Sequence, residues 1–110
     1  MKSKSRTITK QFESLLPAKR SPSHPGEMLA EEFLGPLGIN QTVFAKHLGW
    51  THARVNEIIR GKRGVTPESA LAIADALGTT PDLWLNLQRN YDLWHAMQGR
   101  KPIKPIKKAA

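Results

Sequence analysis

Apolar side chains in the middle of the chain recur at three- and four-residue intervals, the spacing of one face of an α-helix. Five stretches show this pattern, and none of them alternates as a strand does. They are residues 25–34, 41–48, 51–60, 67–77 and 81–98. The pattern predicts an all-α domain of five helices, with a loop at Gly35-Pro36-Leu37-Gly38 between the first two.

Residues that begin and end helices flank these stretches. Asn40 and Thr51 are expected to cap the second and third helices, because their side-chain oxygens can accept from unpaired backbone N–H groups. Thr66-Pro67 and Thr80-Pro81 give the fourth and fifth helices a cap followed by proline, whose missing N–H is harmless at the first helical position. Gly49 supplies the left-handed conformation that ends the second helix.

The second and third helices, within residues 41–60, have the spacing of a helix-turn-helix. Ala45 is small enough to let the two helices cross closely, and Gly49 and Trp50 form and fill the corner. The buried face of the third helix is expected to consist of Val55, Ile58 and Ile59. Any tight pair of helices could use the same residues, so the interpretation depends on the surface chemistry of the third helix.

The fifth helix is apolar over more of its circumference than one core face requires. One stripe is made by Trp84, Leu87, Tyr91 and Trp94, and further apolar residues lie beyond it. We therefore expect the helix to pack against its twin in a homodimer. The expected interface residues are Leu83, Leu85, Leu93, Trp94 and Met97. The alternative is a helix wedged deep into a single core.

The two ends of the chain differ from the helical domain at residues 24–98. Residues 1–23 are predicted to be a basic arm, in which Ile8, Phe12, Leu15 and Leu16 lie on one face of a possible short helix. Such a helix is marginal alone, and it could dock on the core or become ordered against a partner. Residues 99–110 contain two prolines and are expected to form an extended, flexible basic tail.

Positive charge is concentrated in three places. Residues 1–24 carry six Lys or Arg and one Glu, and residues 99–110 carry five Lys or Arg and no acid, so each end has a net charge of +5. Residues 25–98 have six bases and eight acids, but within 40–64 five bases face a single acid. Positive charge concentrated in this way is typical of a protein that binds a polyanion with one face of its surface. Ends that merely keep the chain soluble are an equal alternative for the two tails.

The sequence gives little support for disulfides, metal sites, membrane insertion or catalysis. The chain has no cysteine, which excludes disulfides and Cys-based zinc sites and fits the cytoplasm. No apolar run is long enough to span a membrane. The histidines are His24, His47, His52 and His95, and none forms the paired pattern of a helical zinc hydrolase. We therefore expect neither an enzyme nor a cofactor or metal.

The outward side of the third helix carries residue types that read DNA. Arg can pair with guanine, Asn with adenine and Glu with cytosine, and Ala can contact a thymine methyl group. The predicted base-reading residues are Thr51, His52, Ala53, Arg54, Asn56 and Glu57. The predicted phosphate contacts are Gln41, Lys46, Arg60, Lys62 and Arg63. Glu57 is unfavourable beside phosphates and is expected to orient Arg54 or Arg60. A solvated helix face is the alternative.

Three motifs around the helix-turn-helix give the chain a family resemblance. They are His24-Pro25-Gly26-Glu27-Met28-Leu29, then Gly61-Lys62-Arg63-Gly64-Val65-Thr66-Pro67-Glu68, and Trp84-Leu85-Asn86-Leu87-Gln88. Over residues 24–98 the chain resembles the HigA (VapI-type) antitoxins, which are Xre-type proteins with a lambda-repressor-like fold. The resemblance implies a dimer that binds its own operator and represses its own operon. It also implies neutralisation of a HigB-type toxin, a ribosome-dependent mRNA endonuclease.

The resemblance matches the family's DNA-contacting positions to residues of this chain. These are Gln41, Thr51, His52, Arg54 and Asn56. The long N-terminal arm and the lysine-rich tail depart from the family pattern, so we assign no toxin-binding residues. A free-standing Xre-type regulator without a toxin partner remains the alternative function.

Overall fold

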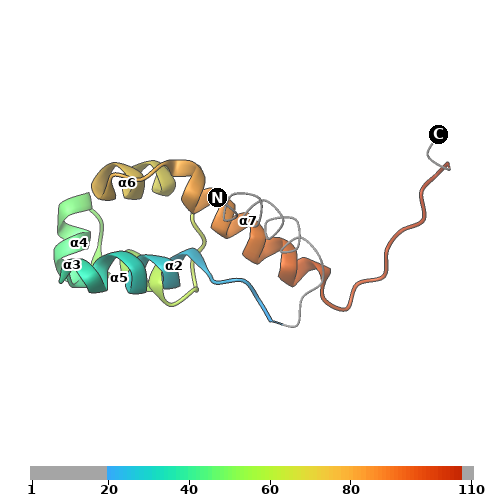
Figure 1. Cartoon of the computed structure of the whole chain (residues 1–110), viewed down its shortest axis with the longest axis horizontal. Helices are drawn as coiled ribbons and strands as arrows, with labels where there is room; N and C mark the ends of the chain where they lie inside the picture. The colour runs from blue at the N-terminus through green and yellow to red at the C-terminus, as the bar shows by residue number, and fades with distance from the viewer. Residues whose placement is uncertain (1–19, 108–110) are drawn as a thin grey trace, which may run out of the picture.

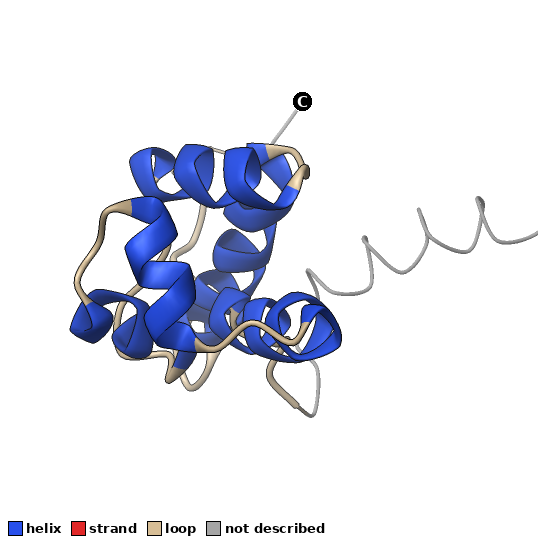
Figure 2. Cartoon of the chain, turned by 90° about the vertical axis from the view of Figure 1, so that its left-hand side faces the viewer, coloured by secondary structure: helices blue, strands red, loops and turns tan. Residues whose placement is uncertain are grey.

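The computed structural model describes residues 20–107, so the amphipathic stretch expected between Ile8 and Leu16 lies outside the described residues. Every regular element within 20–107 is helical (Figure 2). In chain order they are α2 (Pro25–Met28), η1 (Leu29–Leu34), α3 (Gly35–Leu37), α4 (Gln41–Leu48), α5 (His52–Ile59), α6 (Pro67–Leu77) and α7 (Pro81–Met97). Because α2, η1 and α3 are continuous, the described chain has the five helices that the pattern predicts.

The expectation of a loop at Gly35-Pro36-Leu37-Gly38 is wrong, because the first helix continues through Pro36 to Leu37. Proline has no N–H and would leave a carbonyl unpaired in a regular α-helix. The wider π-helical turn η1 precedes it, and in that turn the Gly35 N–H donates to the Ala30 carbonyl. The helix ends only at Gly38, whose φ is +68°.

The corner between α4 and α5 has the caps that the sequence predicts. Asn40 Oδ1 accepts a hydrogen bond of 2.8 Å from the Val43 N–H, and Thr51 Oγ1 accepts one of 3.1 Å from the Arg54 N–H. Gly49 has a φ of +75°, which a residue with a side chain adopts only with strain. The Trp50 N–H donates back to the Ala45 carbonyl at 2.9 Å. Few torsions remain free at this corner, so α5 has a defined direction relative to α4.

Trp84 lies at the centre of the hydrophobic core. Its side chain is fully buried, its ring centroid is 5.3 Å from that of Phe33, and its Nε1–H donates to Thr79 Oγ1 at 2.8 Å. The indole thus buries its apolar surface and still satisfies its one donor. The other buried apolar residues are Leu29, Leu34, Phe44, Ala45, Val55, Ile58, Val65, Ala70, Ile73 and Ala74.

Helix α2 packs against the C-terminal end of α5 through a glycine. A Cβ atom added at Gly26 would lie 1.8 Å from the Ile58 carbonyl oxygen, so the two backbones are in direct contact. His24 caps α2 by accepting from the Gly26 N–H through Nδ1 at 2.9 Å. The buried His24 ring lies edge-on to Tyr91 of α7, with centroids 4.8 Å apart. His24 and Gly26 therefore fix the end of α5 against two other helices.

The segment after α5 is attached to α7. The Gln88 side chain accepts a hydrogen bond of 2.7 Å from the Val65 N–H through Oε1. A Cβ atom at Gly64 would come within 3.2 Å of the same side chain, so the glycine allows the close approach. Thr66 and Ser69 then form a reciprocal capping box that starts α6.

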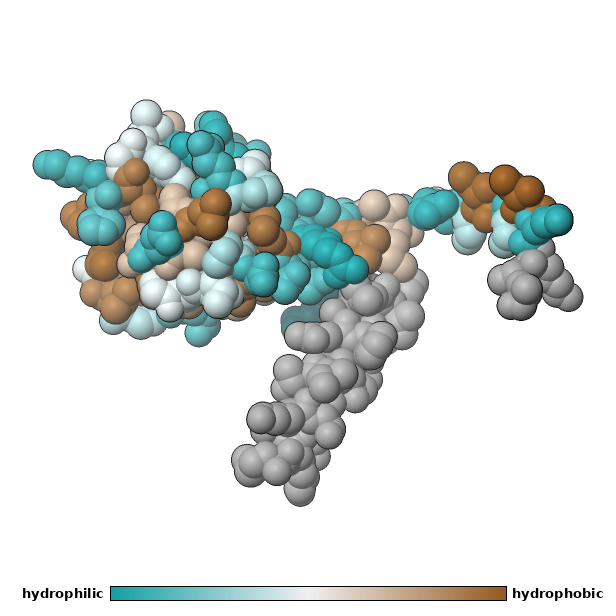
Figure 3. Space-filling model, turned by 90° about the horizontal axis from the view of Figure 1, so that it is seen from above, coloured by the Kyte–Doolittle hydropathy of each residue, from teal (hydrophilic) through white to brown (hydrophobic). Residues whose placement is uncertain are grey.

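Helix α7 leads away from the helix-turn-helix, and the basic tail extends beyond its end, still further from the other helices (Figure 1). Residues 98–107 contain no helix, and the extended, flexible form expected of the tail stays a prediction. Ile103 and Ile106 are 86% and 103% exposed, and brown hydrophobic spheres cap the far part of the tail in Figure 3.

Gly26→Ala is expected to lower the free energy of unfolding by about 1–3 kcal/mol, because the added methyl group collides with backbone rather than with a movable side chain. Urea denaturation followed by tryptophan fluorescence measures the change. Gly35→Ala is the matched control, since its new Cβ comes no closer than 3.2 Å to the Ala30 carbonyl oxygen. Equal effects of the two substitutions would contradict the close packing of Gly26.

The stability of the domain is expected to depend on the protonation of His24. Burial lowers the pKa of the imidazole from its usual 6.5, against an opposing effect of Asp92 and Glu27. The folded state favours the neutral ring, whose Nδ1 accepts from Gly26. The stabilisation is therefore present above pH 6.5 and is lost as the pH falls through the folded-state pKa.

The variant His24→Asn tests this expectation, because asparagine is also a good helix cap but does not titrate. Between about pH 7.5 and about pH 5, the wild-type protein should lose more unfolding free energy than the variant does. Urea titrations at both pH values provide the comparison, and the three other histidines are common to both proteins. Parallel pH profiles would exclude His24 as the group responsible.

Candidate nucleic-acid interface

The first turn of α5 is exposed at the surface of the helix-turn-helix. Thr51, His52 and Ala53 are exposed, whereas Val55 and Ile58 on the other side of the helix are almost completely buried. Ile59 is partly buried and packs against the core, so the expected inward face is confirmed. The helix thus presents its N-terminal residues to a partner while its opposite face anchors it to the domain.

The Arg54 side chain lies against Trp50. Its guanidinium carbon is 3.9 Å from the centroid of the Trp50 ring. Its Nη2 atom is 3.8 Å from the Glu68 carboxylate at the start of α6, and the side chain is 28% exposed. Arg54 is thus a cation held between Trp50 and Glu68 at the edge of the exposed turn, next to the other residues predicted to read bases.

Asn56 on α5 and Gln41 at the start of α4 are hydrogen-bonded to each other. Asn56 Nδ2 donates to Gln41 Oε1 at 3.0 Å, and both side chains are partly buried. The pair leaves the side-chain oxygen Oδ1 of Asn56 and the side-chain amino group Nε2 of Gln41 available to other partners. The structure therefore joins a residue predicted to read bases to one predicted to contact phosphate.

Glu57 does not orient Arg54 or Arg60 as expected, because it pairs with Arg63. Glu57 Oε1 accepts from Arg63 Nε at 2.8 Å and lies 2.7 Å from Arg63 Nη2. The turn after α5 bends Arg63 back over the last turn of the helix, and this proximity decides the partner. The pairing neutralises an acid that would otherwise repel phosphates.

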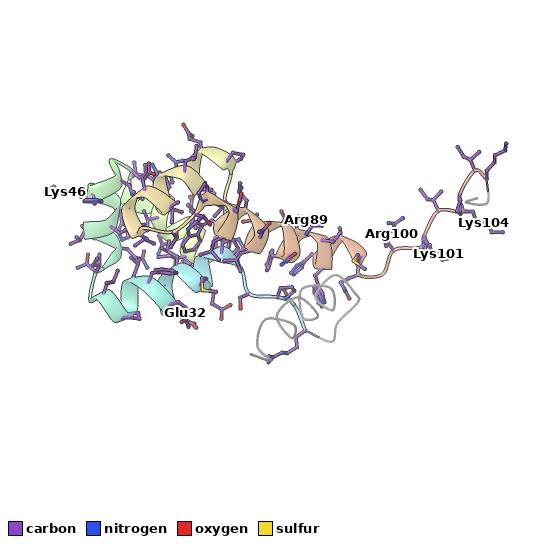
Figure 4. All side chains as sticks on the ribbon, turned by 45° about the horizontal axis from the view of Figure 1, so that its top comes forward. Glu32, Lys46, Arg89, Arg100, Lys101 and Lys104 are labelled. Atoms are coloured by element: carbon purple, nitrogen blue, oxygen red, sulfur yellow. The ribbon has the colours of Figure 1, made fainter. Side chains whose placement is uncertain are left out.

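The remaining predicted phosphate residues occupy different parts of the surface. Lys46 is exposed on α4, at the end of the molecule opposite the tail, as Figure 4 shows. Lys62 is exposed in the turn after α5. Arg60 lies at the opposite end of α5 from His52, where it borders an open pocket of about 540 Å³ with His24 and Glu27. The structure therefore does not group Arg60 with the exposed first turn.

Three residues that position α5 are absent from the predicted site. His24 and Gly26 hold its C-terminal end, and Gln88 holds the segment that follows it. Their place in the family motifs is the one feature of the sequence that could have pointed to them. Composition and helical periodicity say nothing about such long-range contacts. These residues shape the interface without forming part of its surface.

The residues predicted to form a dimer interface all keep part of their surface exposed. Leu83 and Leu85 also pack against the core, whereas Leu93, Trp94 and Met97 lie further along α7, beyond that cluster. A second copy covering the distal residues stays a prediction. Within residues 20–107, no helix is long and apolar enough to cross a membrane. In the same part of the chain, no group of three or more His, Asp or Glu side chains lies close enough together to hold a metal ion.

Comparison with known proteins assigns the family. The helix-turn-helix family model matches residues 29–84. Virulence-associated protein I of Dichelobacter nodosus is 42% identical over 83 residues, which cover 76% of this chain and 77% of that protein. Antitoxin HigA-1 of Vibrio cholerae is 41% identical over 93 residues, covering 80% and 87% of the two chains.

A solved structure shows the same arrangement of helices. It is the Pseudomonas aeruginosa antitoxin HigA with the higBA promoter, which aligns with a TM-score of 0.67 and 31% identity over 76% of this chain and 99% of the other. The matching motifs, the all-helical fold and these relatives agree with one another. The chain belongs to the Xre-type helix-turn-helix family of the HigA antitoxins.

Proposed function

We propose that this protein is a sequence-specific DNA-binding antitoxin that represses its own operon as a homodimer and neutralises a HigB-type mRNA endonuclease in the cytoplasm. The observation that carries the DNA-binding part is the exposed first turn of α5, which is held at one end by the Gly49–Trp50 corner and at the other by Gly26. A helix fixed in this way can enter the major groove with its N-terminal residues at the base edges.

The relatives support this proposal from a second direction. The Pseudomonas aeruginosa HigA structure contains the higBA promoter, and its helices superimpose on those of this chain. The base-reading residues proposed here are Thr51, His52, Ala53, Arg54, Asn56 and Glu57. Glu57 accepts from Arg63, so it has less capacity to accept from cytosine than a free carboxylate.

Phosphate contacts are proposed for the cations around the turn. Lys46 and Lys62 are exposed, and neither forms an ion pair with another residue of the stretch 20–107 that would have to break on binding. Gln41 lies at the N-terminal end of α4, where unpaired N–H groups attract anions. Arg63 can contribute only by sharing or releasing Glu57, and Arg60 lies at the end of α5 opposite its first turn. Two copies related by a two-fold axis would read half-sites ~34 Å apart.

Substitution of Arg54 and Lys62 should separate base reading from phosphate contact. Arg54→Ala is expected to weaken operator binding by about 1–3 kcal/mol and to relax specificity at one position. Lys62→Ala is expected to weaken binding to all duplexes alike. It should also reduce the slope of log affinity against log salt concentration by about one. Gel-shift titrations at several salt concentrations, with a duplex from the promoter of the protein's own operon and with an unrelated duplex, measure both effects.

Arg89→Ala is the matched control, because Arg89 is an exposed cation on α7, remote from α4 and α5 in Figure 4. It should leave binding to both specific and unrelated duplexes unchanged. A footprint without two-fold symmetry, or equal losses for Lys62→Ala and Arg89→Ala, would count against the proposed DNA face.

Neutralisation of a toxin is tested by genetic context and co-expression. If the neighbouring reading frame encodes a small basic protein of the HigB type, its expression should arrest growth, and co-expression of this chain should restore growth. A protein that binds its operator but has no toxic neighbour would instead be a free-standing Xre-type regulator. That outcome removes the toxin from the proposal and leaves the repressor.

A further inference from the structure

Arg54 is more constrained than an ordinary surface arginine. Its guanidinium carbon lies over the Trp50 ring, 3.9 Å from the ring centroid, and Trp50 itself packs against the core. The Nε atom is buried and has no hydrogen-bond partner. The indole therefore covers one face of the cation and its inner N–H points away from solvent, so only the outer end of the side chain can engage a partner.

Glu68 holds that outer end loosely. Its carboxylate is 3.8 Å from Arg54 Nη2, which is an electrostatic contact but too long for a hydrogen bond. The Glu68 side chain is 90% exposed, so water weakens the attraction and allows the carboxylate to move aside. The donors of the two terminal amino groups consequently remain free for another acceptor.

The acceptor that matches two adjacent terminal amino groups in the major groove is guanine. Its O6 and N7 atoms accept a bidentate pair from arginine, whereas adenine offers one acceptor beside a donor. An arginine already restricted by stacking loses less conformational freedom when it makes this pair. Stacking also does not use the in-plane hydrogen atoms that the base needs.

We propose that Trp50 and Glu68 are positioning residues that hold Arg54 ready to read a guanine of the operator. Trp50 fixes the plane and direction of the guanidinium. The charge of Glu68 repels the phosphates of any duplex, and its competition for Arg54 Nη2 disfavours most the DNA that offers no pair of acceptors. This inference rests on the proposed binding of operator DNA and assigns roles to two residues that do not themselves read a base.

The first test uses duplexes selected by the full-length wild-type protein from a randomised pool. The guanine read by Arg54 is the position at which Arg54→Ala loses its preference. Trp50→Leu is expected to lose roughly 3- to 30-fold of the discrimination between this guanine and other bases. Its affinity for an unselected duplex should fall by less than its affinity for the selected one. Trp50→Phe, which keeps an aromatic face, should retain most of the preference.

The second test removes the charge of Glu68. Glu68→Gln is expected to bind the unselected duplex about two- to fivefold more tightly and to discriminate less at the same guanine. Asp82→Asn is the matched control, since Asp82 is an exposed acid in the first turn of α7. It removes the same charge but should leave the guanine preference unchanged.

The outcomes separate this inference from the proposed function. Failure of the wild type to select any sequence would overturn both. A selected site whose guanine preference survives Trp50→Leu and Glu68→Gln would overturn only the positioning roles. Equal loss of binding by Trp50→Leu to selected and unselected duplexes would show that Trp50 merely supports the fold, and would also overturn the inference.

Discussion

The contact between the Gly26 backbone and the Ile58 carbonyl determines where α5 lies in the domain. No side chain separates the two helices at this point, so α2 and α5 approach as closely as their backbones allow. His24 reinforces the contact from the side by capping α2 and packing against Tyr91. A helix located by backbone contact has little room to tilt, which suits a helix whose exposed end must match a groove of fixed shape.

The three sequence motifs become one structural unit around this contact. The first motif supplies His24 and Gly26, the second supplies the turn that follows α5, and the third supplies Trp84 and Gln88. Gln88 joins the second motif to the third through its bond with Val65, and Trp84 fills the core beneath them. The motifs are far apart in the chain, yet each restrains the same short helix. The three motifs therefore serve the same purpose, which is to hold α5 in a fixed position.

Local chemistry made much of this fold predictable. Asn40, Gly49 and Thr51 act on neighbouring backbone atoms, so their roles could be inferred from sequence alone, and the structure bears them out. Pro36 led to the wrong prediction of a loop, because the π-helical turn before it allows the helix to continue past the proline. The partner of Glu57 could not be inferred either, since Arg63 reaches it only after the chain has turned. Side-chain pairing across a fold depends on distances that no periodicity encodes.

The bond between Asn56 and Gln41 has a consequence for how the specificity of such a protein can diverge. Each amide completes the other, so replacing Asn56 alone would strand an acceptor on Gln41 in a partly buried place. Changing the base that Asn56 is proposed to read would thus require two mutations, one on each helix, with a weakened intermediate between them. Positions 41 and 56 should then change together among descendants of this chain, because either substitution alone leaves an amide without its partner.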